Sequence, residues 1–215
     1  MNHKKTKISV QIWRVILKEL DSKMEASCLR RDAYLSKILR FELEKLDEEI
    51  TQLNSPEAYK YVSNKLDLLD RKLITLTIDA DLVEKLNEIC TRKRIVRDAF
   101  FNRLFFMLVA SNARVDALFL VPEDWRIEIW SKYRNDFFGN IFNPLDEVMN
   151  PLEPLRHGIE EYKLDHFYCT VFQSLNNINL EGLNTYLPDE YIPGSEAYKI
   201  SEKSLDELLG ILGTN

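Results

Sequence analysis

The chain contains one sequence pattern twice, and this repeat limits the possible folds more than any other feature does. RRDAYLSKIL at residues 30–39 has a counterpart in VRDAFFNRLF at residues 96–105, which lies 66 positions later. The same shift aligns Ile8 with Ile74 and Leu20 with Leu86, so the register runs through both copies without a gap. We therefore expect a structural unit that is duplicated within one chain.

Each copy opens with residues that alternate between apolar and polar types, KISVQIW at 7–13 and LITLTID at 73–79. This alternation, rich in β-branched residues, predicts a short strand with one buried face. The expected buried residues are Ile8, Val10 and Ile12 in the first copy, and Ile74, Leu76 and Ile78 in the second. Since successive side chains point to opposite sides, the outer face carries Lys7, Ser9 and Gln11, and Leu73, Thr75 and Thr77.

After each strand the apolar period becomes that of a helix. The first helices are expected to bury Ile16, Leu20 and Met24, and Leu82, Leu86 and Cys90, and Asp79 is expected to cap the second of them. A second helix then starts near Arg31 or Arg97, with the expected buried stripes Tyr34, Ile38 and Phe41, and Phe100, Leu104 and Leu108. Each unit is thus predicted to be strand, helix, helix.

That order resembles the ribbon-helix-helix fold of the Arc/MetJ/CopG superfamily of DNA-binding proteins, over residues 5–43 and 71–108. The resemblance implies an antiparallel ribbon of two strands that enters the DNA major groove, with the helices as its core. The predicted fold class is α+β, mainly α: two ribbon-helix-helix repeats in one chain, with a mostly helical C-terminal region. Whether the strands pair within one chain or across a dimer is left open at this point.

The resemblance also implies which residues read DNA bases. The family's outer-face positions fall on Lys7, Ser9, Gln11, Leu73, Thr75 and Thr77. These side chains suit base edges, because Gln pairs with adenine, Lys donates to guanine, and methyl groups contact thymine. The two half-ribbons carry different residues, so an asymmetric DNA site is expected.

A phosphate clamp is the family's second feature. It consists of a small or hydroxyl residue followed by Arg at the start of the second helix, often after a Gly. Here the Arg occurs twice, but Arg30 and Val96 occupy the hydroxyl position, and Cys28 and Arg94 the Gly position. Free amides at the helix start remain available to an anion. The expected phosphate contacts are Lys5, Arg30, Arg31, Lys72, Arg94 and Arg97.

Charge is divided unevenly along the chain. Residues 1–110 hold 21 Lys and Arg against 17 Asp and Glu, whereas residues 111–215 hold 8 against 18. A basic half followed by an acidic half favours double-stranded DNA as the partner of the first and a protein, or a second copy of the chain, as the partner of the other. A truncation near residue 110 is accordingly expected to keep DNA recognition.

The expected organisation has four parts: a first unit at 1–45, a helical linker at 46–70, a second unit at 71–110 and an acidic C-terminal region at 111–215. Ser55 and Pro56 indicate a helix start in the linker. In the last region we expect an aromatic helix at 123–138, short proline-punctuated helices at 143–162, and a terminal helix from the capping box of Ser204 and Glu207 to Leu212. Its aromatic residues are interpreted as core, or alternatively as a protein-binding surface: Trp125, Trp130, Tyr133, Tyr186 and Tyr191.

No enzyme signature occurs in the sequence. Cys28, Cys90 and Cys169 lack the close spacing of zinc or redox sites and are interpreted as buried free thiols. His157 and His166 lie nine residues apart, and 6 glycines leave no Gly-rich phosphate loop. We expect no catalytic residue, metal or cofactor. Without a membrane-spanning run or a signal sequence, the expected location is the cytoplasm.

Two functions are compatible with these patterns. The first is a sequence-specific, autoregulatory transcriptional repressor that reads the major groove of double-stranded DNA and whose C-terminal region oligomerises or senses a signal. The alternative is an antitoxin, or a DNA accessory protein, whose C-terminal region binds a partner protein. A folded C-terminal region favours the repressor.

Overall fold

The computed structural model describes residues 4–119, 150, 152–153, 155–157 and 166–212. These residues form a mainly helical α+β fold with one sheet of two strands. In chain order the elements are β1 (Lys5–Trp13), α1 (Arg14–Ala26), α2 (Arg31–Glu49), α3 (Pro56–Asp67), β2 (Arg71–Asp79), α4 (Ala80–Lys93), α5 (Arg97–Val109), α6 (Asn112–Leu118), the 3-10 helices η2 (Glu181–Leu183) and η3 (Asp189–Tyr191), and α9 (Glu196–Leu212).

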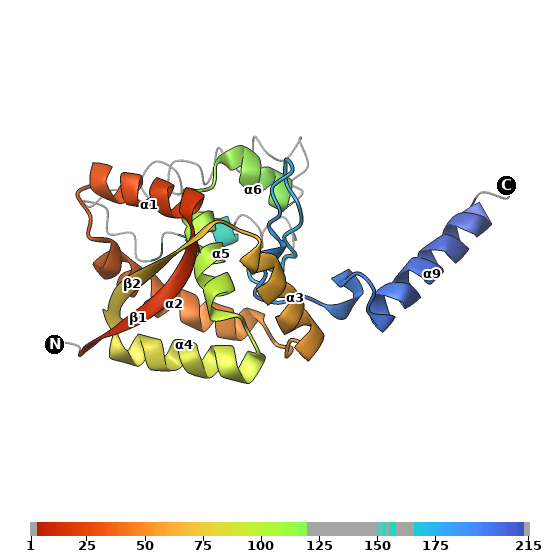
Figure 1. The fold of residues 1–215 in the computed structure, drawn as a ribbon, viewed down its shortest axis with the longest axis horizontal. Helices are drawn as coiled ribbons and strands as arrows, with labels where there is room; N and C mark the ends of the chain where they lie inside the picture. Colours follow the sequence, from red (N-terminus) through yellow and green to blue (C-terminus); the bar gives the residue numbers. More distant parts are fainter. Residues whose placement is uncertain (1–3, 120–149, 151, 154, 158–165, 213–215) are drawn as a thin grey trace.

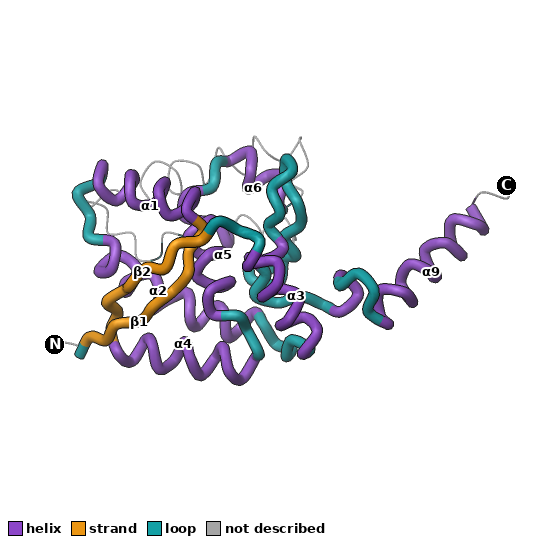
Figure 2. The backbone as a smooth tube through the Cα atoms, viewed as in Figure 1, coloured by secondary structure: helices purple, strands orange, loops and turns teal. Residues whose placement is uncertain are grey.

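The two strands pair with each other inside the chain (Figures 1 and 2). They run antiparallel, from Lys5 opposite Asp79 to Trp13 opposite Arg71. In Figure 1 they cross the molecule diagonally, with α1 above and α4 below. The pairing question that the sequence left open is therefore answered: one chain supplies both strands of the sheet.

One face of this sheet lies on the core. Its six alternating apolar residues are all buried, as the sequence predicted: Ile8, Val10, Ile12, Ile74, Leu76 and Ile78. The predicted stripes of α1 and α4 are buried with them and are also confirmed: Ile16, Leu20, Met24, Leu82, Leu86 and Cys90. Local periodicity was sufficient here, because one face of each element packs on the core and the other meets solvent.

The predicted buried stripes of the second helices are confirmed in part. In α2, Ile38 is buried as predicted, but Tyr34 and Phe41 are only half-buried, and the buried apolar side is completed by Leu35, Leu39, Leu43 and Leu46. In α5, the predicted Phe100, Leu104 and Leu108 are buried, and so is every other residue from Ala99 to Val109. The cause is the later part of the chain, which packs over the outer side of α5 and contributes Leu152, Leu155, Phe167, Tyr168, Phe172, Leu180 and Leu183 to the same core.

Arg103 shows how closely α5 joins the later segments. Its guanidinium is fully buried, donates to the carbonyl oxygens of Thr170 at 3.0 Å and of Phe167, and lies 3.8 Å above the centre of the Phe172 ring. A buried guanidinium requires such partners to offset its loss of water. The basic and acidic halves of the sequence therefore share one core.

The linker is helical where the sequence predicted a helix. The Ser55 hydroxyl accepts a hydrogen bond from the Ala58 amide at 2.9 Å, and Pro56 occupies the first turn of α3. Gly182 lies against this helix so closely that an added Cβ would stand 2.5 Å from the Leu66 nitrogen. Asp79, in contrast, does not cap α4 with its side chain; its carboxylate pairs with Arg40 of α2.

The C-terminal region differs from its predicted form. Residues 166–195 are mainly loop with two 3-10 helices, so this segment is not mostly helical. The terminal helix α9 begins at Glu196 and not at Ser204, because the Ser195 hydroxyl accepts from the Tyr198 amide at 3.0 Å. α9 then extends away from the body of the molecule (Figure 1). The helix expected at 123–138 lies outside the described residues, as does most of 143–162.

Candidate functional site

The outer face of the two-stranded sheet brings together all six residues that the sequence singled out there. They stand opposite one another in three cross-strand pairs: Lys7 and Thr77, Ser9 and Thr75, Gln11 and Leu73. Five of the six are exposed and Thr77 is half-exposed. Leu73 is 64% exposed and adds an apolar side chain to this otherwise polar face.

The ribbon has approximate twofold symmetry about its central pair. Ser9 and Thr75 are equivalent positions of the two repeats, and they face each other. At one end of the ribbon the Arg14 amide donates to the Asp70 carbonyl at 2.9 Å, and at the other end the Ala80 amide donates to the Lys4 carbonyl at 2.8 Å. These two bonds also join equivalent positions of the two repeats.

A second symmetric pair of bonds ties the helices to the strands. The Asp32 carboxylate of α2 accepts from the Thr77 amide at 2.8 Å, and the Asp98 carboxylate of α5 accepts from the Gln11 amide at 3.3 Å. The two aspartates and the two amides are again equivalent positions. The repeated Arg-Asp-Ala motif therefore fixes each second helix beside the strand of the other repeat.

Asn102 is a site residue that the sequence analysis missed. Its side chain accepts from the Trp13 amide and donates to the Gln11 carbonyl, both at 2.8 Å. The equivalent position in α2 holds Ser36, whose hydroxyl reaches only the Asp32 carbonyl in its own helix. A polar residue inside the apolar run FFNRLFF was the available signal, because a buried amide needs partners.

The residues expected to contact phosphates lie around the ribbon but differ in their partners. Lys5, Arg30 and Lys72 are exposed. Arg94 donates to the Asn54 carbonyl at 2.8 Å, so its side chain also fastens the linker loop.

The remaining two are the arginines of the repeated motif. Arg31 bonds to Asp21 at 2.9 Å, and Arg97 donates to the Ser9 carbonyl at 2.9 Å. Both side chains lie beside the start of their helix, but one meets a carboxylate and the other a strand carbonyl.

The turns that precede these helix starts have the same backbone form in both repeats. Cys28 and Arg94 adopt left-handed conformations with φ of 55° and 52°. After each of them, the amide of Leu29 or Ile95 bonds back to the carbonyl of residue 24 or 90, at 2.9 and 2.8 Å. A glycine usually occupies such a position, so two L-residues there carry a conformational cost. Cys28 is exposed in this turn, which corrects its interpretation as a buried thiol; Cys90 is buried and Cys169 half-buried.

Burial alters two titrations near the start of α5. Desolvation raises the pKa of Asp98, and the hydrogen bond from the Gln11 amide opposes part of that shift. Desolvation also raises the pKa of Cys90 to about 12. This shift favours the neutral thiol of Cys90 at physiological pH.

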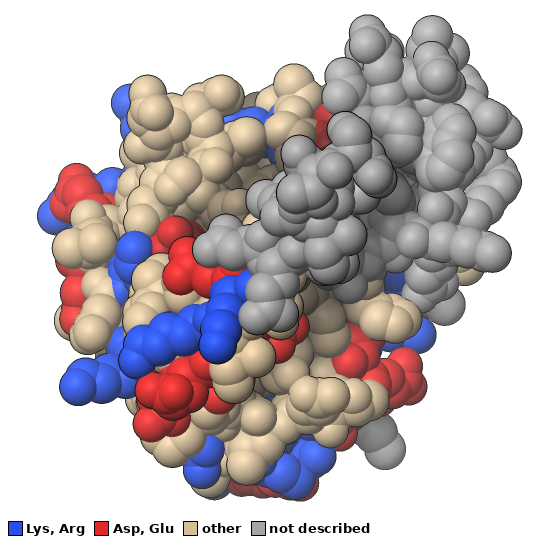
Figure 3. Space-filling view, turned by 90° about the vertical axis from the view of Figure 1, so that its right-hand side faces the viewer, with Lys and Arg blue, Asp and Glu red and all other residues tan. Residues whose placement is uncertain are grey.

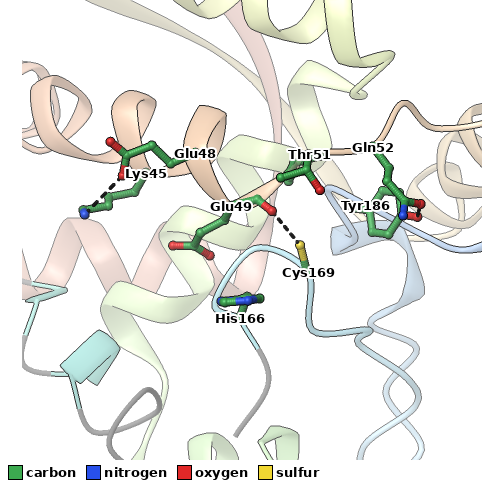
Figure 4. Close-up of a pocket in the computed structure, with 9 residues that line it drawn as sticks. Lys45, Glu48, Glu49, Thr51, Gln52, His166, Cys169 and Tyr186 are labelled. Atoms are coloured by element: carbon green, nitrogen blue, oxygen red, sulfur yellow. Dashed lines mark hydrogen bonds and ion pairs between the residues drawn. The ribbon is translucent and has the colours of Figure 1, made fainter. Parts of the chain in front are cut away.

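A separate hollow of about 370 Å³ lies at the C-terminal end of α2 (Figure 4). Its charged and polar groups already bind one another: Lys45 pairs with Glu48 at 3.3 Å, and the Cys169 thiol donates to the Glu49 carbonyl at 3.3 Å. Within the described part of the chain, no group of His, Cys, Asp and Glu residues forms a set that would hold a metal ion. No described helix is long and apolar enough to cross a membrane.

Charges are mixed on the side of the molecule that Figure 3 shows. Lys and Arg side chains lie next to Asp and Glu side chains on the described part of this face. Such a mixture is typical of a solvated surface and does not produce a strong field of one sign. Charge alone therefore does not make this side of the described structure a candidate polyanion site.

Comparisons of the chain with protein-family models, with characterised proteins and with solved structures gave no match. Its function has to be argued from its own sequence and geometry.

Proposed function

We propose that the protein is a ribbon-helix-helix DNA-binding protein that acts as a sequence-specific transcriptional regulator, repressing its own gene. One observation carries the proposal: the six outer-face residues form a single exposed surface, arranged as three cross-strand pairs about the Ser9–Thr75 pair. A two-stranded ribbon of this kind fits the major groove, where each base pair presents a distinct set of donors, acceptors and methyl groups.

The pairs offer different chemistry along the ribbon. The central Ser9–Thr75 pair presents two hydroxyls, which serve either type of base. The flanking pairs occupy equivalent places but contain Lys7 with Thr77 on one side and Gln11 with Leu73 on the other. A reader with unlike halves favours a DNA site whose two halves also differ.

One chain supplies a complete ribbon, which supports recognition by a single molecule. In a family whose units pair to form the ribbon, each unit needs a partner strand; here β1 and β2 serve each other. The side chains of Asp32, Asp98 and Asn102 bond to the outer edges of the strands. Those bonds occupy backbone groups that would otherwise be open to a further strand.

The second candidate is an antitoxin or a DNA accessory protein that also binds a protein. It is favoured by α9, which projects from the body and exposes Ile200 and Leu205. Apolar side chains in that setting are typical of contacts with another protein. Both candidates use the same ribbon for DNA, so they differ in what the C-terminal region does.

Replacing both Gln11 and Thr75 with Ala tests the ribbon. We expect specific binding to weaken by about 1 to 3 kcal/mol for each base that is no longer recognised, while nonspecific binding is retained. The measurement is a band-shift titration on DNA from upstream of the gene, after footprinting has located the site, together with an unrelated duplex of the same length.

A control replaces Ser22 and Asn64 with Ala. These neutral residues are exposed, lie on helices α1 and α3 and are not among the six outer-face residues. The control should bind DNA like the wild type. Wild-type affinity in the Gln11 and Thr75 variant would contradict base reading by this face.

A further inference from the structure

The two arginines of the repeated motif have different electrostatic surroundings, although the sequence places them at equivalent positions. The Arg31 Nη1 lies 2.9 Å from the Asp21 carboxylate, and its Nε lies 3.6 Å from the Asp32 carboxylate. An arginine held between two carboxylates has little net attraction left for another anion. Arg31 is therefore neutralised within its own repeat.

Arg97 has fewer carboxylates beside it: Asp98 interacts with it electrostatically, but Arg97 has no ion pair like that of Arg31 with Asp21. Its Nη2 donates to the uncharged Ser9 carbonyl at 2.9 Å, and among the described residues it forms no ion pair. The difference has a simple source in the sequence, because Asn87 stands in α4 where Asp21 stands in α1. This exchange of a carboxylate for an amide removes one of the two acidic partners that Arg31 has, and leaves Asp98 as the acidic group that acts on Arg97.

One neighbouring position differs in the same direction. Thr91 is the counterpart of Glu25, so a second carboxylate near the first helix start is replaced by a hydroxyl near the second, whereas Glu88 is the counterpart of Ser22 and adds a carboxylate. Around α5 the matching positions carry two positive and two negative charges, from Arg94, Arg97, Glu88 and Asp98. Around α2 they carry two positive and three negative charges, from Arg30, Arg31, Asp21, Glu25 and Asp32. The balance of charge is therefore less negative around α5 than around α2.

A hollow of about 460 Å³ lies beside Arg97. Its polar lining includes four side chains that can donate hydrogen bonds to phosphate oxygens, from Arg94, Asn87, Thr91 and Tyr59, and one carboxylate, from Asp98. Tyr59 belongs to α3, the helix in the linker between the two repeats. The linker therefore adds a donor on the α5 side of the ribbon.

We propose that the protein holds the DNA backbone from one side: Arg97, with Arg94 and the hollow beside them, binds a backbone phosphate, whereas Arg31 does not. This inference rests on the proposed function. It makes the footprint asymmetric about the ribbon, with stronger protection of the phosphates that flank α5. A protein with two equal anchors would protect both flanks.

The salt dependence of DNA binding measures the anchors directly. DNA affinity falls as salt is added. Each phosphate contact adds about 0.9 to the steepness of this fall in a plot of log affinity against log salt concentration, and this steepness is called the slope here. On duplex DNA carrying the footprinted site, Arg97→Ala should lower the slope by about 0.9, whereas Arg31→Ala should leave it unchanged.

Two opposite exchanges at exposed positions test whether Asp21 and Asn87 cause the difference between Arg31 and Arg97. Asn87→Asp should place a carboxylate near Arg97 and lower the slope by about 0.9. Asp21→Asn should free Arg31 and raise the slope by up to about 0.9. Asp21 and Asn87 are exposed on their helices, so folding should be unaffected; thermal unfolding checks this.

The outcomes separate the two proposals. Equal slope losses in Arg31→Ala and Arg97→Ala, or a wild-type slope in Asn87→Asp, would overturn the one-sided anchor and leave DNA recognition standing. A wild-type protein that binds no duplex would overturn the proposed function and this inference together. The expected pattern is a loss from the two changes around α5 and a gain from Asp21→Asn.

Discussion

At the scale of a single residue, Asp98 stabilises the fold through a hydrogen bond and destabilises it through the burial of its charge. Its carboxylate accepts the Gln11 amide and so fixes α5 to β1, yet it loses water where it does this. Desolvation raises its pKa, which means that the folded state favours the neutral carboxyl more than the unfolded chain does. The hydrogen bond stabilises the fold, and the buried charge offsets part of that gain.

We therefore expect Asp98→Asn to be at least as stable as the wild type at pH 7, because the amide oxygen can still accept the Gln11 amide. The gain should stay below about 1 kcal/mol, since the carboxylate is partly screened by solvent. Asp98→Ala should lose about 1 to 2 kcal/mol, because the amide loses its acceptor. Urea unfolding of both variants measures these differences.

The difference in stability between Asp98→Asn and the wild type should change with pH in one direction. A carboxyl with a raised folded pKa contributes stability that is fully present below its ordinary pKa of 3.8 and is lost as the pH rises through the folded value. The advantage of Asp98→Asn over the wild type should therefore shrink as the pH falls from 7 toward 4. A growing advantage on acidification would show that the carboxylate is stabilised in the fold.

At the scale of the elements, the two repeats share a plan but differ in how firmly they hold the ribbon. α5 reaches the edge of β1 through Arg97, Asp98 and Asn102. Among the described residues, the α2 side chain that bonds to the backbone of β2 is Asp32. Arg40 of α2 forms an ion pair with the Asp79 side chain at the end of that strand. β1 is thus the more firmly held strand.

Asn102→Ala measures that difference. The change removes the bonds to the Trp13 amide and the Gln11 carbonyl as well as one to the Asp98 carbonyl, so we expect a loss of about 2 to 4 kcal/mol in the free energy of unfolding. Ser36→Ala is the matched control at the equivalent position, and it should cost less than about 1 kcal/mol. Similar losses in the two variants would contradict the asymmetry; chemical denaturation decides it.

The sequence correctly predicted the elements that have one buried face and one solvent-exposed face. β1, β2, α1 and α4 each have one face on the core and one in solvent, so their period alone located the buried residues and the six outer-face positions. The period could not reveal that the outer side of α5 is covered by segments more than 60 residues away, as the bond from Arg103 to Thr170 shows. The same limit hid the role of Asn102, whose partners lie in β1.

At the scale of the whole molecule, a buried charged cluster joins the first repeat to the later chain. Arg156, only 3% exposed, donates to Glu42 at 2.9 Å and to Glu49, and both glutamates belong to α2. Tyr168 donates through its hydroxyl to Glu42 and through its amide to Glu49. Burial raises the pKa of Glu49, against the opposing pull of Arg156 and the Tyr168 amide. Without these partners, two carboxylates would be left in a dry interior.

This shared core reverses the expected result of truncation near residue 110. A chain ending at Ala110 would lose Arg156 together with the segments that cover Glu42 and Glu49, so these ion pairs and the apolar contacts of the later chain with the core would both be lost. It would also expose the aromatic side of α5, including Phe106, which packs 6.1 Å from Phe172 between ring centres. Typical domains have only about 5 to 15 kcal/mol of stability in total. We therefore expect the truncated chain to lose cooperative unfolding and to aggregate.

A chain ending at Ser195 is the control, because it removes only α9, which projects from the body. It should unfold cooperatively and bind DNA with the affinity and salt slope of the full chain. Circular dichroism melting and sizing chromatography compare the two truncations. Cooperative melting and DNA binding by the chain that ends at Ala110 would show that the tandem repeat folds alone and that the charged cluster is an addition to it. Loss of folding in that chain alone would show that folding of the DNA-binding unit requires residues between 111 and 195.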